Sequence, residues 1–220
     1  MISHLYKYTQ NVYALKMVQT GQCRVGTLFE YRDKEKHGSE VGDSDEGRKT
    51  TYSNDPLIDW TKPETVPDIV KRVVKVGEGR NPIFQNCWFN VNEESPDCYV
   101  FSVAEALNPN VMREFGYDAV VRITHPNLFF QALTECLQNM RRIKSEFTLS
   151  KCRYIDRTQH YSRQHSIHPA FMKDPRYKYQ QEVRVIWIPE ENPIEPVILE
   201  CPQLRMHCSL ISNAELMKEN

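Results

Sequence analysis

The strongest strand signal in this chain is the run of β-branched and aromatic residues from 183 to 188. Side chains alternate along a strand, so one face of this run is entirely apolar. The opposite face begins with Glu182 and Arg184. A carboxylate and a guanidinium are costly to bury unpaired. This strand face therefore predicts either an internal ion pair or contacts with a ligand.

Other strand signals are spread along the whole chain, and few segments have a helical period. We expect strands at 5–8, 23–31, 83–91, 98–103, 119–123 and 152–155, with two more within 196–211. We expect helices at 11–19, 66–76, 111–115 and 127–140. A turn-forming segment separates the runs 83–91 and 98–103, which predicts a hairpin. The mixture predicts an α+β fold with a split, mixed, mostly antiparallel sheet and a few flanking helices.

The length of 220 residues fits one domain covering residues 1–220. Residues 33–65 are expected to form a long loop, because they are rich in turn signals, carboxylates and glycines. Such a loop is either a solvated surface segment or a lid over a site. Asp43 and Asp45 resemble the start of a calcium-binding loop, but Gly47 comes one position early and no Glu occupies the twelfth place.

The bulk composition excludes several classes of protein. The net charge is −1, so a general electrostatic grip on nucleic acid is not indicated. No apolar stretch approaches the roughly 18 residues that a membrane helix needs, and the first residues do not resemble a secretory leader. The seven cysteines are odd in number and none are spaced as CxxC, which predicts free thiols and a cytoplasmic protein.

Three histidines, His160, His165 and His168, lie close together in the sequence. They lack Cys, Asp or Glu partners at the spacing of a standard metal site. We therefore interpret them as loop histidines, either exposed or close to a substrate crevice, in preference to metal ligands.

The N-terminal segment predicts a strand, a helix ended by Gly21, and a second strand. Tyr6 and Tyr8 on the first strand then face a crevice beside the second, or are ordinary strand aromatics. Arg32 follows the second strand. Its guanidinium could bind a phosphate or carboxylate with two hydrogen bonds, or form a surface salt bridge with a neighbouring acidic side chain.

The Gln180-x-Glu182 motif at the start of a late strand, together with this N-terminal unit, resembles mono-ADP-ribosyltransferases. The resemblance implies that Glu182 holds a ribose hydroxyl of NAD and stabilises the oxocarbenium-like transition state. It implies that Gln180 positions the acceptor. It also implies that Tyr6 or Tyr8 is the first-strand residue near the dinucleotide. Thr27 or Tyr31 is then the corresponding residue of the second strand.

The chain is also similar to a group of uncharacterised bacterial domains found near phage-defence genes. Those domains begin with a Tyr-Lys-Tyr strand, have a central Cys-Phe-Ser-like strand and end in Glu-x-Glu-x-Arg. The segments 6–8, 98–102 and 180–184 fit this outline, which covers most of the chain. The first strand departs from the transferases, because it carries no His-Gly-Thr or Arg motif.

The expected function is an NAD-dependent ADP-ribosyltransferase that modifies a protein, RNA or DNA, as a toxin or antiviral effector with a neutralising antitoxin. A fixed carboxylate lowers the barrier to cleavage of the bond between ribose and nicotinamide. Aromatic side chains would wall the nicotinamide, and Arg32, Lys7 or Arg184 would donate to the diphosphate. No membrane partner is expected.

Two other functions stay open at this point. One is a metal-dependent nuclease that uses Asp and Glu, although the segment Glu182-Val183-Arg184 lacks the Lys of a common nuclease strand motif. The other is a non-catalytic interaction module, in which the same polar groups form structural ion pairs.

Overall fold

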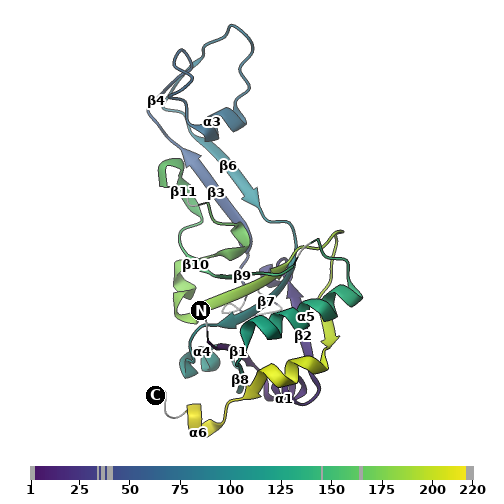
Figure 1. The fold of residues 1–220 in the computed structure, drawn as a ribbon. Helices are drawn as coiled ribbons and strands as arrows, with labels where there is room; N and C mark the ends of the chain where they lie inside the picture. Colours follow the sequence, from purple (N-terminus) through teal and green to yellow (C-terminus); the bar gives the residue numbers. More distant parts are fainter. Residues whose placement is uncertain are drawn as a thin grey trace.

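A computed structural model describes residues 3–216, except 34, 36, 37, 39–41, 145, 164 and 165. Its body is an antiparallel sheet of eight strands (Figure 1). The strands are β1 (Leu5–Thr9), β2 (Gln22–Thr27), β7 (Tyr99–Ala104), β8 (Ala119–Ile123), β9 (Thr148–Lys151), β13 (Glu182–Trp187), β14 (Val197–Glu200) and β15 (Cys208–Leu210). They follow the order β14-β2-β7-β1-β8-β15, and β13 pairs with β7 and β9. The expected α+β class and largely antiparallel pairing are confirmed.

The sheet splits along one edge of β7. The other edge of β7 pairs with β13 from Tyr99 to Ala104. Along the split edge, β2 pairs with the first two residues of β7, and β1 pairs with the last one. The strands β1 and β2 therefore diverge opposite Ser102, and the predicted split is present.

One face of the sheet holds the main apolar core. The helices α1 (Asn11–Thr20) and α5 (Pro126–Met140) cover it, together with the 3₁₀ helix η5 (Pro202–His207). The predicted apolar face of β13 is fully buried here, with Val183, Val185 and Trp187. Gly21 ends α1 at φ 79°, and a Cβ there would lie 2.0 Å from the carbonyl oxygen of Cys201. This close approach requires glycine.

The opposite face of β7 and β13 is covered by irregular segments and short helices. These are α4 (Pro109–Glu114), η3 (Pro169–Phe171), β12 (Met172–Lys173) and η4 (Pro175–Gln180). Two small apolar clusters lie on this face, one around Tyr8 and Val111 and one around Val100 and Ile186. Buried polar side chains, among them Glu182 and Arg184, fill the space between them.

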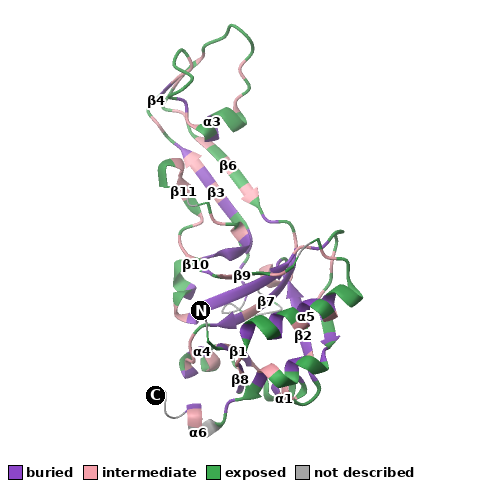
Figure 2. Cartoon of the chain, in the orientation of Figure 1, coloured by how far each residue is buried: buried purple, intermediate pink, exposed green. Residues whose placement is uncertain are grey.

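An arm (residues 48–94) projects from the body (Figure 1). Its base is a three-stranded sheet of β3 (Arg48–Ser53), β6 (Phe89–Glu94) and β11 (Thr158–His160). Its far end carries β4 (Leu57–Asp59), β5 (Ile83–Gln85) and α3 (Asp68–Val73) around a separate small apolar cluster. Much of the arm surface is exposed (Figure 2). The remaining elements are η1 (Glu30–Arg32), β10 (Arg153–Tyr154), η2 (Tyr161–Arg163) and α6 (Asn213–Leu216).

Two sequence-based predictions for the arm region are wrong. Residues 33–65 are not one long loop, because β3 and β4 lie within them. The predicted hairpin between 83–91 and 98–103 is also wrong, since β6 pairs with β3 and β7 lies in the body. The strand β6 alternates between half-buried and exposed residues, so it suits the half-exposed sheet of the arm, whereas β7 is buried almost throughout.

Two elements are shorter than the sequence predicts. The strand expected at 23–31 ends at Thr27, and the helix expected at 66–76 is limited to α3. All seven cysteines are free thiols. Among the described residues, no helix is long and apolar enough to cross a membrane.

Candidate active site

A small cavity lies where β1 and β2 diverge from β7. Its volume is about 100 Å³. One part of its wall is aromatic, formed by Tyr6, Tyr8, Tyr31, Phe115 and Tyr117. The other part is polar, formed by Lys7, Glu46, Ser102, Lys173, Gln180, Glu182 and Arg184. The structure therefore brings together residues from β1, β7, β13, η4 and the loop before β3.

An outer cleft of about 640 Å³ adjoins this cavity. The two spaces share Lys7 and three of the tyrosines, Tyr8, Tyr31 and Tyr117. Cationic side chains on the cleft wall outnumber the acidic ones, with Lys7, Lys16 and Arg24 against Glu30. The combined volume falls in the usual range for small-molecule sites, and the charge of the cleft favours an anionic group.

Glu182 opens β13 and is 8% exposed. Its Oε1 accepts hydrogen bonds from Ser102 Oγ (2.7 Å) and Arg184 Nε (2.6 Å), and its Oε2 forms an ion pair with Lys173 Nζ. Burial by itself would raise the pKa of Glu182, but the charges of Arg184 and Lys173 hold it well below its ordinary value. Glu182 is therefore a carboxylate throughout the physiological range of pH.

Gln180 lies next to Glu182, although not for the reason that the sequence suggested. It ends the 3₁₀ helix η4 and is not part of the strand. Gln181 has a left-handed backbone (φ 45°), which turns the chain into β13. The Oε1 of Gln180 accepts a hydrogen bond from Lys173 Nζ (2.6 Å), the same ammonium that pairs with Glu182. Lys173 thus contacts both side chains of the Gln180-x-Glu182 motif.

Arg184 is bound by two carboxylates. Its Nη1 and Nη2 donate to Glu46 Oε1 (2.6 Å) and Oε2 (2.9 Å), while its Nε donates to Glu182. Nη1 also donates to the carbonyl of Ala170 (2.7 Å). Arg184 is 3% exposed, so the ion pairs that the sequence left as an alternative are present and buried.

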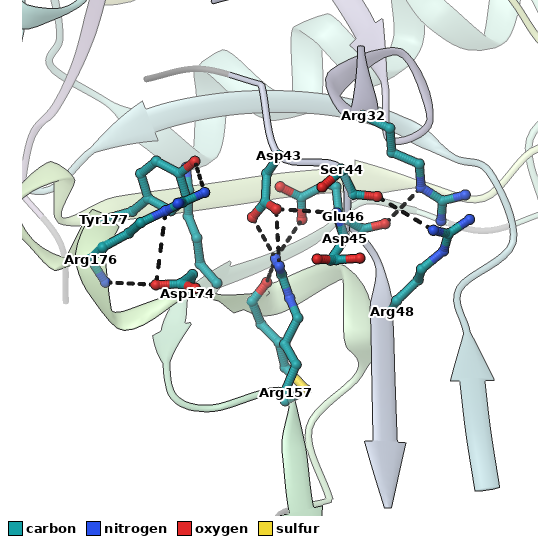
Figure 3. Close-up of polar contacts among 12 residues, drawn as sticks. Arg32, Asp43, Ser44, Asp45, Glu46, Arg48, Arg157, Asp174, Arg176 and Tyr177 are labelled. Carbon is teal, nitrogen blue, oxygen red and sulfur yellow. Dashed lines mark hydrogen bonds and ion pairs between the residues drawn. The ribbon is translucent and has the colours of Figure 1, made fainter. Parts of the chain in front are cut away.

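Residues 42–47, which include Glu46, are fastened to the body by other ionic contacts (Figure 3). Arg157 donates to both carboxylate oxygens of Asp43, at 3.1 Å and 2.8 Å. Arg32 Nε donates to the carbonyl of Glu46 (2.8 Å), and Tyr177 donates to the carbonyl of Gly42 (3.3 Å). This part of the acidic segment is an anchored wall of the site.

Lys7 bridges the split in the sheet. Its ammonium donates to the carbonyl of Ser102 (2.8 Å) and lies 4.6 Å from the ring centre of Phe101. Burial lowers the pKa of Lys7 to about 8, while the charge of Glu182 acts in the opposite direction. The position gives the cavity a cation that titrates close to neutral pH.

The three predicted cofactor-binding tyrosines all line the cavity. Tyr6 is half-buried. Tyr8 is buried, and its hydroxyl donates to the carbonyl of Ala106 (3.0 Å) and accepts from the N–H of Asn108 (2.6 Å). The hydroxyl of Tyr31 packs closely against Gly26, where a Cβ would lie 2.7 Å from it. Burial raises the pKa of both Tyr8 and Tyr31 to about 12, so both stay protonated.

Thr27 and Arg32 line neither space, as far as the described residues show. Thr27 Oγ1 accepts from the N–H of Glu30 (3.2 Å). Arg32 pairs with Glu94 (2.6 Å) and stacks on Phe29 at 3.7 Å. Thr27 is therefore used in local structure, whereas Arg32 joins the backbone of Glu46 to the carboxylate of Glu94.

The two described histidines of this group, His160 and His168, have different contacts. His160 lies on β11, against Tyr52 and Ser162. His168 accepts a hydrogen bond from Ala170 N at the start of η3 (3.3 Å), and His165 lies outside the described residues. In the part of the chain that the structure describes, no three His, Cys, Asp or Glu side chains could hold a metal ion.

Sequence reasoning missed three residues that hold the site together. Glu46 lay hidden among many carboxylates of the acidic segment. Lys173 follows the apolar pair 171–172, and a lysine after such a run can indicate a buried cation. Ser102 is the one small polar side chain in the apolar and aromatic segment of β7, and this was a usable signal.

Comparison with known proteins does not assign the chain to a family. No protein-family model matches it, and no curated protein or solved structure matches it.

Proposed function

We propose that this protein is an NAD-dependent ADP-ribosyltransferase that modifies a macromolecule. The observation that carries the proposal is the position of Glu182. It is a permanently ionised carboxylate in the wall of a small, partly aromatic cavity that opens into a cationic cleft. This combination suits a dinucleotide whose reacting ribose lies beside a fixed negative charge.

The chemistry breaks the bond between C1 of the ribose and the nitrogen of nicotinamide. The electron pair leaves with nicotinamide, which becomes neutral, and positive charge develops on the ribose. A carboxylate at Glu182 stabilises that charge. A nucleophilic atom of the acceptor then bonds to C1 and loses its proton. The inner cavity, with Tyr6 and Tyr31 in its wall, offers an aromatic surface for the nicotinamide ring.

The outer cleft suits the remainder of the dinucleotide. Lys7, Lys16 and Arg24 provide positive charge for a diphosphate. Arg24 also pairs with Glu30, so a bound diphosphate would share it. The acceptor is a protein, RNA or DNA. An enzyme that modifies such targets would act as a toxin or antiviral effector in the cytoplasm, and its host would need a neutralising antitoxin.

A metal-dependent nuclease fits the site less well. Metal-bound carboxylates need free oxygen lone pairs directed at one point. The carboxylates of Glu182, Glu46 and Asp43 are each directed at an arginine or lysine instead.

The non-catalytic alternative is favoured by the same ion pairs, because buried ionic networks can be purely structural.

One experiment separates these functions. The protein is incubated with NAD labelled on the adenylate and with a mixture of protein, RNA and DNA. The proposal predicts release of nicotinamide and transfer of label to one macromolecular fraction. An interaction module predicts neither. A nuclease predicts shortened RNA or DNA that requires a divalent cation and no NAD.

A further inference from the structure

Glu46 is the most deeply buried charged residue of the cavity wall, with 1% of its surface exposed. We infer that Glu46 is a positioning residue, which shares the charge of Arg184 and so leaves more of the negative charge of Glu182 uncancelled at the cavity. This inference rests on the proposed function.

The geometry gives Arg184 more contact with Glu46 than with Glu182. Glu46 takes both terminal nitrogens of the guanidinium, at 2.6 Å and 2.9 Å. Glu182 takes Nε at 2.6 Å, and its second oxygen is 3.4 Å from Nη2. A bidentate pair is the strongest geometry for a guanidinium. Arg184 therefore orients Glu182 while its charge is shared with Glu46.

Glu46 supplies one of the two negative charges beside Arg184 and Lys173. Two carboxylates, Glu46 and Glu182, stand against these two cations, and Lys7 adds a third cation to the cavity wall. Without Glu46, a single carboxylate would face three cations, and the cavity would present more positive charge to the developing ribosyl cation. Charges that are a few ångströms apart interact strongly in a poorly solvated interior. Loss of the Glu46 charge would therefore destabilise the positively charged transition state more than bound NAD.

The backbone fixes Glu46 in place. Its N–H donates to the carbonyl of Asp43 (2.9 Å), and its carbonyl accepts from Arg32 Nε (2.8 Å). The next residue, Gly47, has φ 72°, and its carbonyl accepts from the N–H of Ser95 (2.8 Å). A side chain held at both flanks is preorganised, which an electrostatic role requires.

The first variant is Glu46→Gln. The expected result is a fall in the turnover of NAD of at least about tenfold. Removing a group that stabilises the transition state directly costs about 10²–10³-fold, and Glu46 acts only through Arg184. The Michaelis constant for NAD should change much less, because the charge matters mainly in the transition state. A purely structural Glu46 predicts a lower melting temperature with turnover per folded molecule retained.

The second variant, Glu46→Gln with Arg184→Gln, removes one charge of each sign. The net charge of the cavity wall is then the same as in wild type. We expect turnover to recover by about tenfold over Glu46→Gln, since the uncompensated charge is gone. A structural role predicts no rescue, because the double variant has lost still more hydrogen bonds.

Glu93→Gln is the matched control. Glu93 lies in the arm and pairs with a buried lysine, Lys49, at 3.0 Å. Neither Glu93 nor Lys49 lines the cavity, and their ion pairs do not include Glu46 or Glu182. This variant should melt at a lower temperature, because it leaves Lys49 less compensated, while turnover measured well below that temperature stays close to wild type.

The outcomes separate the inference from the proposed function. A wild-type protein that does not consume NAD overturns the proposed function, and the inference with it. A wild type that consumes NAD, with Glu46→Gln fully active or with no rescue in the double variant, overturns the inference alone. Should Glu46→Gln not fold, Glu46→Asp and the double variant decide. Both are expected within about tenfold of wild type, because both keep the charge balance, and a folded but inactive form of either contradicts the inference.

Discussion

Lys7 and Glu182 are joined through a single residue of the central strand. The ammonium of Lys7 donates to the backbone carbonyl of Ser102, and the hydroxyl of Ser102 donates to the carboxylate of Glu182. Lys7 thus supplies a donor where the split leaves β7 without a neighbouring strand. The same contact places a cation and an anion at one cavity, which a dinucleotide site would use for its diphosphate and its ribose.

The depressed pKa of Lys7 predicts a pH-dependent contribution to stability. The folded protein releases the Lys7 proton at pH about 8, whereas the unfolded chain keeps it until about 10.5. Between these values the unfolded state binds more protons, so this residue makes the folded state more stable as pH rises. Lys7→Met removes that contribution.

The free energy of unfolding should be measured for both proteins from pH 7 to pH 10. The difference between wild type and Lys7→Met should shift in favour of wild type as the pH increases through about 8. Lys16→Met, at an exposed residue of the same cleft, is the control for loss of a positive charge there. A constant difference between Lys7→Met and wild type would show that the Lys7 ammonium is not desolvated.

The depressed pKa of Glu182 predicts the opposite dependence. Its ionised form stabilises the folded state above its ordinary pKa of 4.5, and this stabilisation is lost as the pH falls below that value. Glu182→Gln lacks the titrating group. Acid unfolding followed by circular dichroism should show a smaller loss of stability below pH 4.5 in Glu182→Gln than in wild type. Equal acid sensitivity would mean that Glu182 is not held by Arg184 and Lys173.

The two hydrogen bonds of the Tyr8 hydroxyl in the cavity wall can be tested by the free energy of unfolding. Tyr8→Phe removes the hydroxyl and leaves the carbonyl of Ala106 and the N–H of Asn108 without their partner. The cost should be about 1–3 kcal/mol, the range for stranding a buried polar group. Tyr13→Phe is the control, since Tyr13 is 56% exposed. Chemical denaturation measures both, and a Tyr8→Phe protein as stable as wild type would contradict these two contacts.

The fold class could be predicted because local signals dominate the body. The strand β13 and the helix α5 each bury an apolar face whose period is plain in the sequence. The arm could not be predicted in the same way. Its base is made by pairing β3 with β6 across about forty residues of chain, and such a register depends on tertiary context that no local pattern contains.

The candidate site could be predicted in part. Glu182, Gln180 and Arg184 stood out because polar groups on a strand are conspicuous. Glu46 and Lys173 did not, because each is brought to Glu182 by a separate irregular segment. Arg32 illustrates the reverse case. A lone arginine after a strand suggested a phosphate ligand, but the fold uses it to bind the carbonyl of Glu46 and the carboxylate of Glu94.

In the proposed function, the negative charge of Glu182 stabilises a ribosyl cation. Glu182→Gln keeps the shape of the side chain and removes the charge. Glu215→Gln is the matched control, because Glu215 of α6 forms a partly exposed ion pair with Arg122 of β8. Release of nicotinamide from NAD and the melting temperature are measured on both. The account predicts a loss of about 10²–10³-fold in turnover for Glu182→Gln, with NAD affinity much less affected, and no loss for Glu215→Gln. A Glu182→Gln protein that melts at a lower temperature yet turns over NAD at the wild-type rate would contradict it.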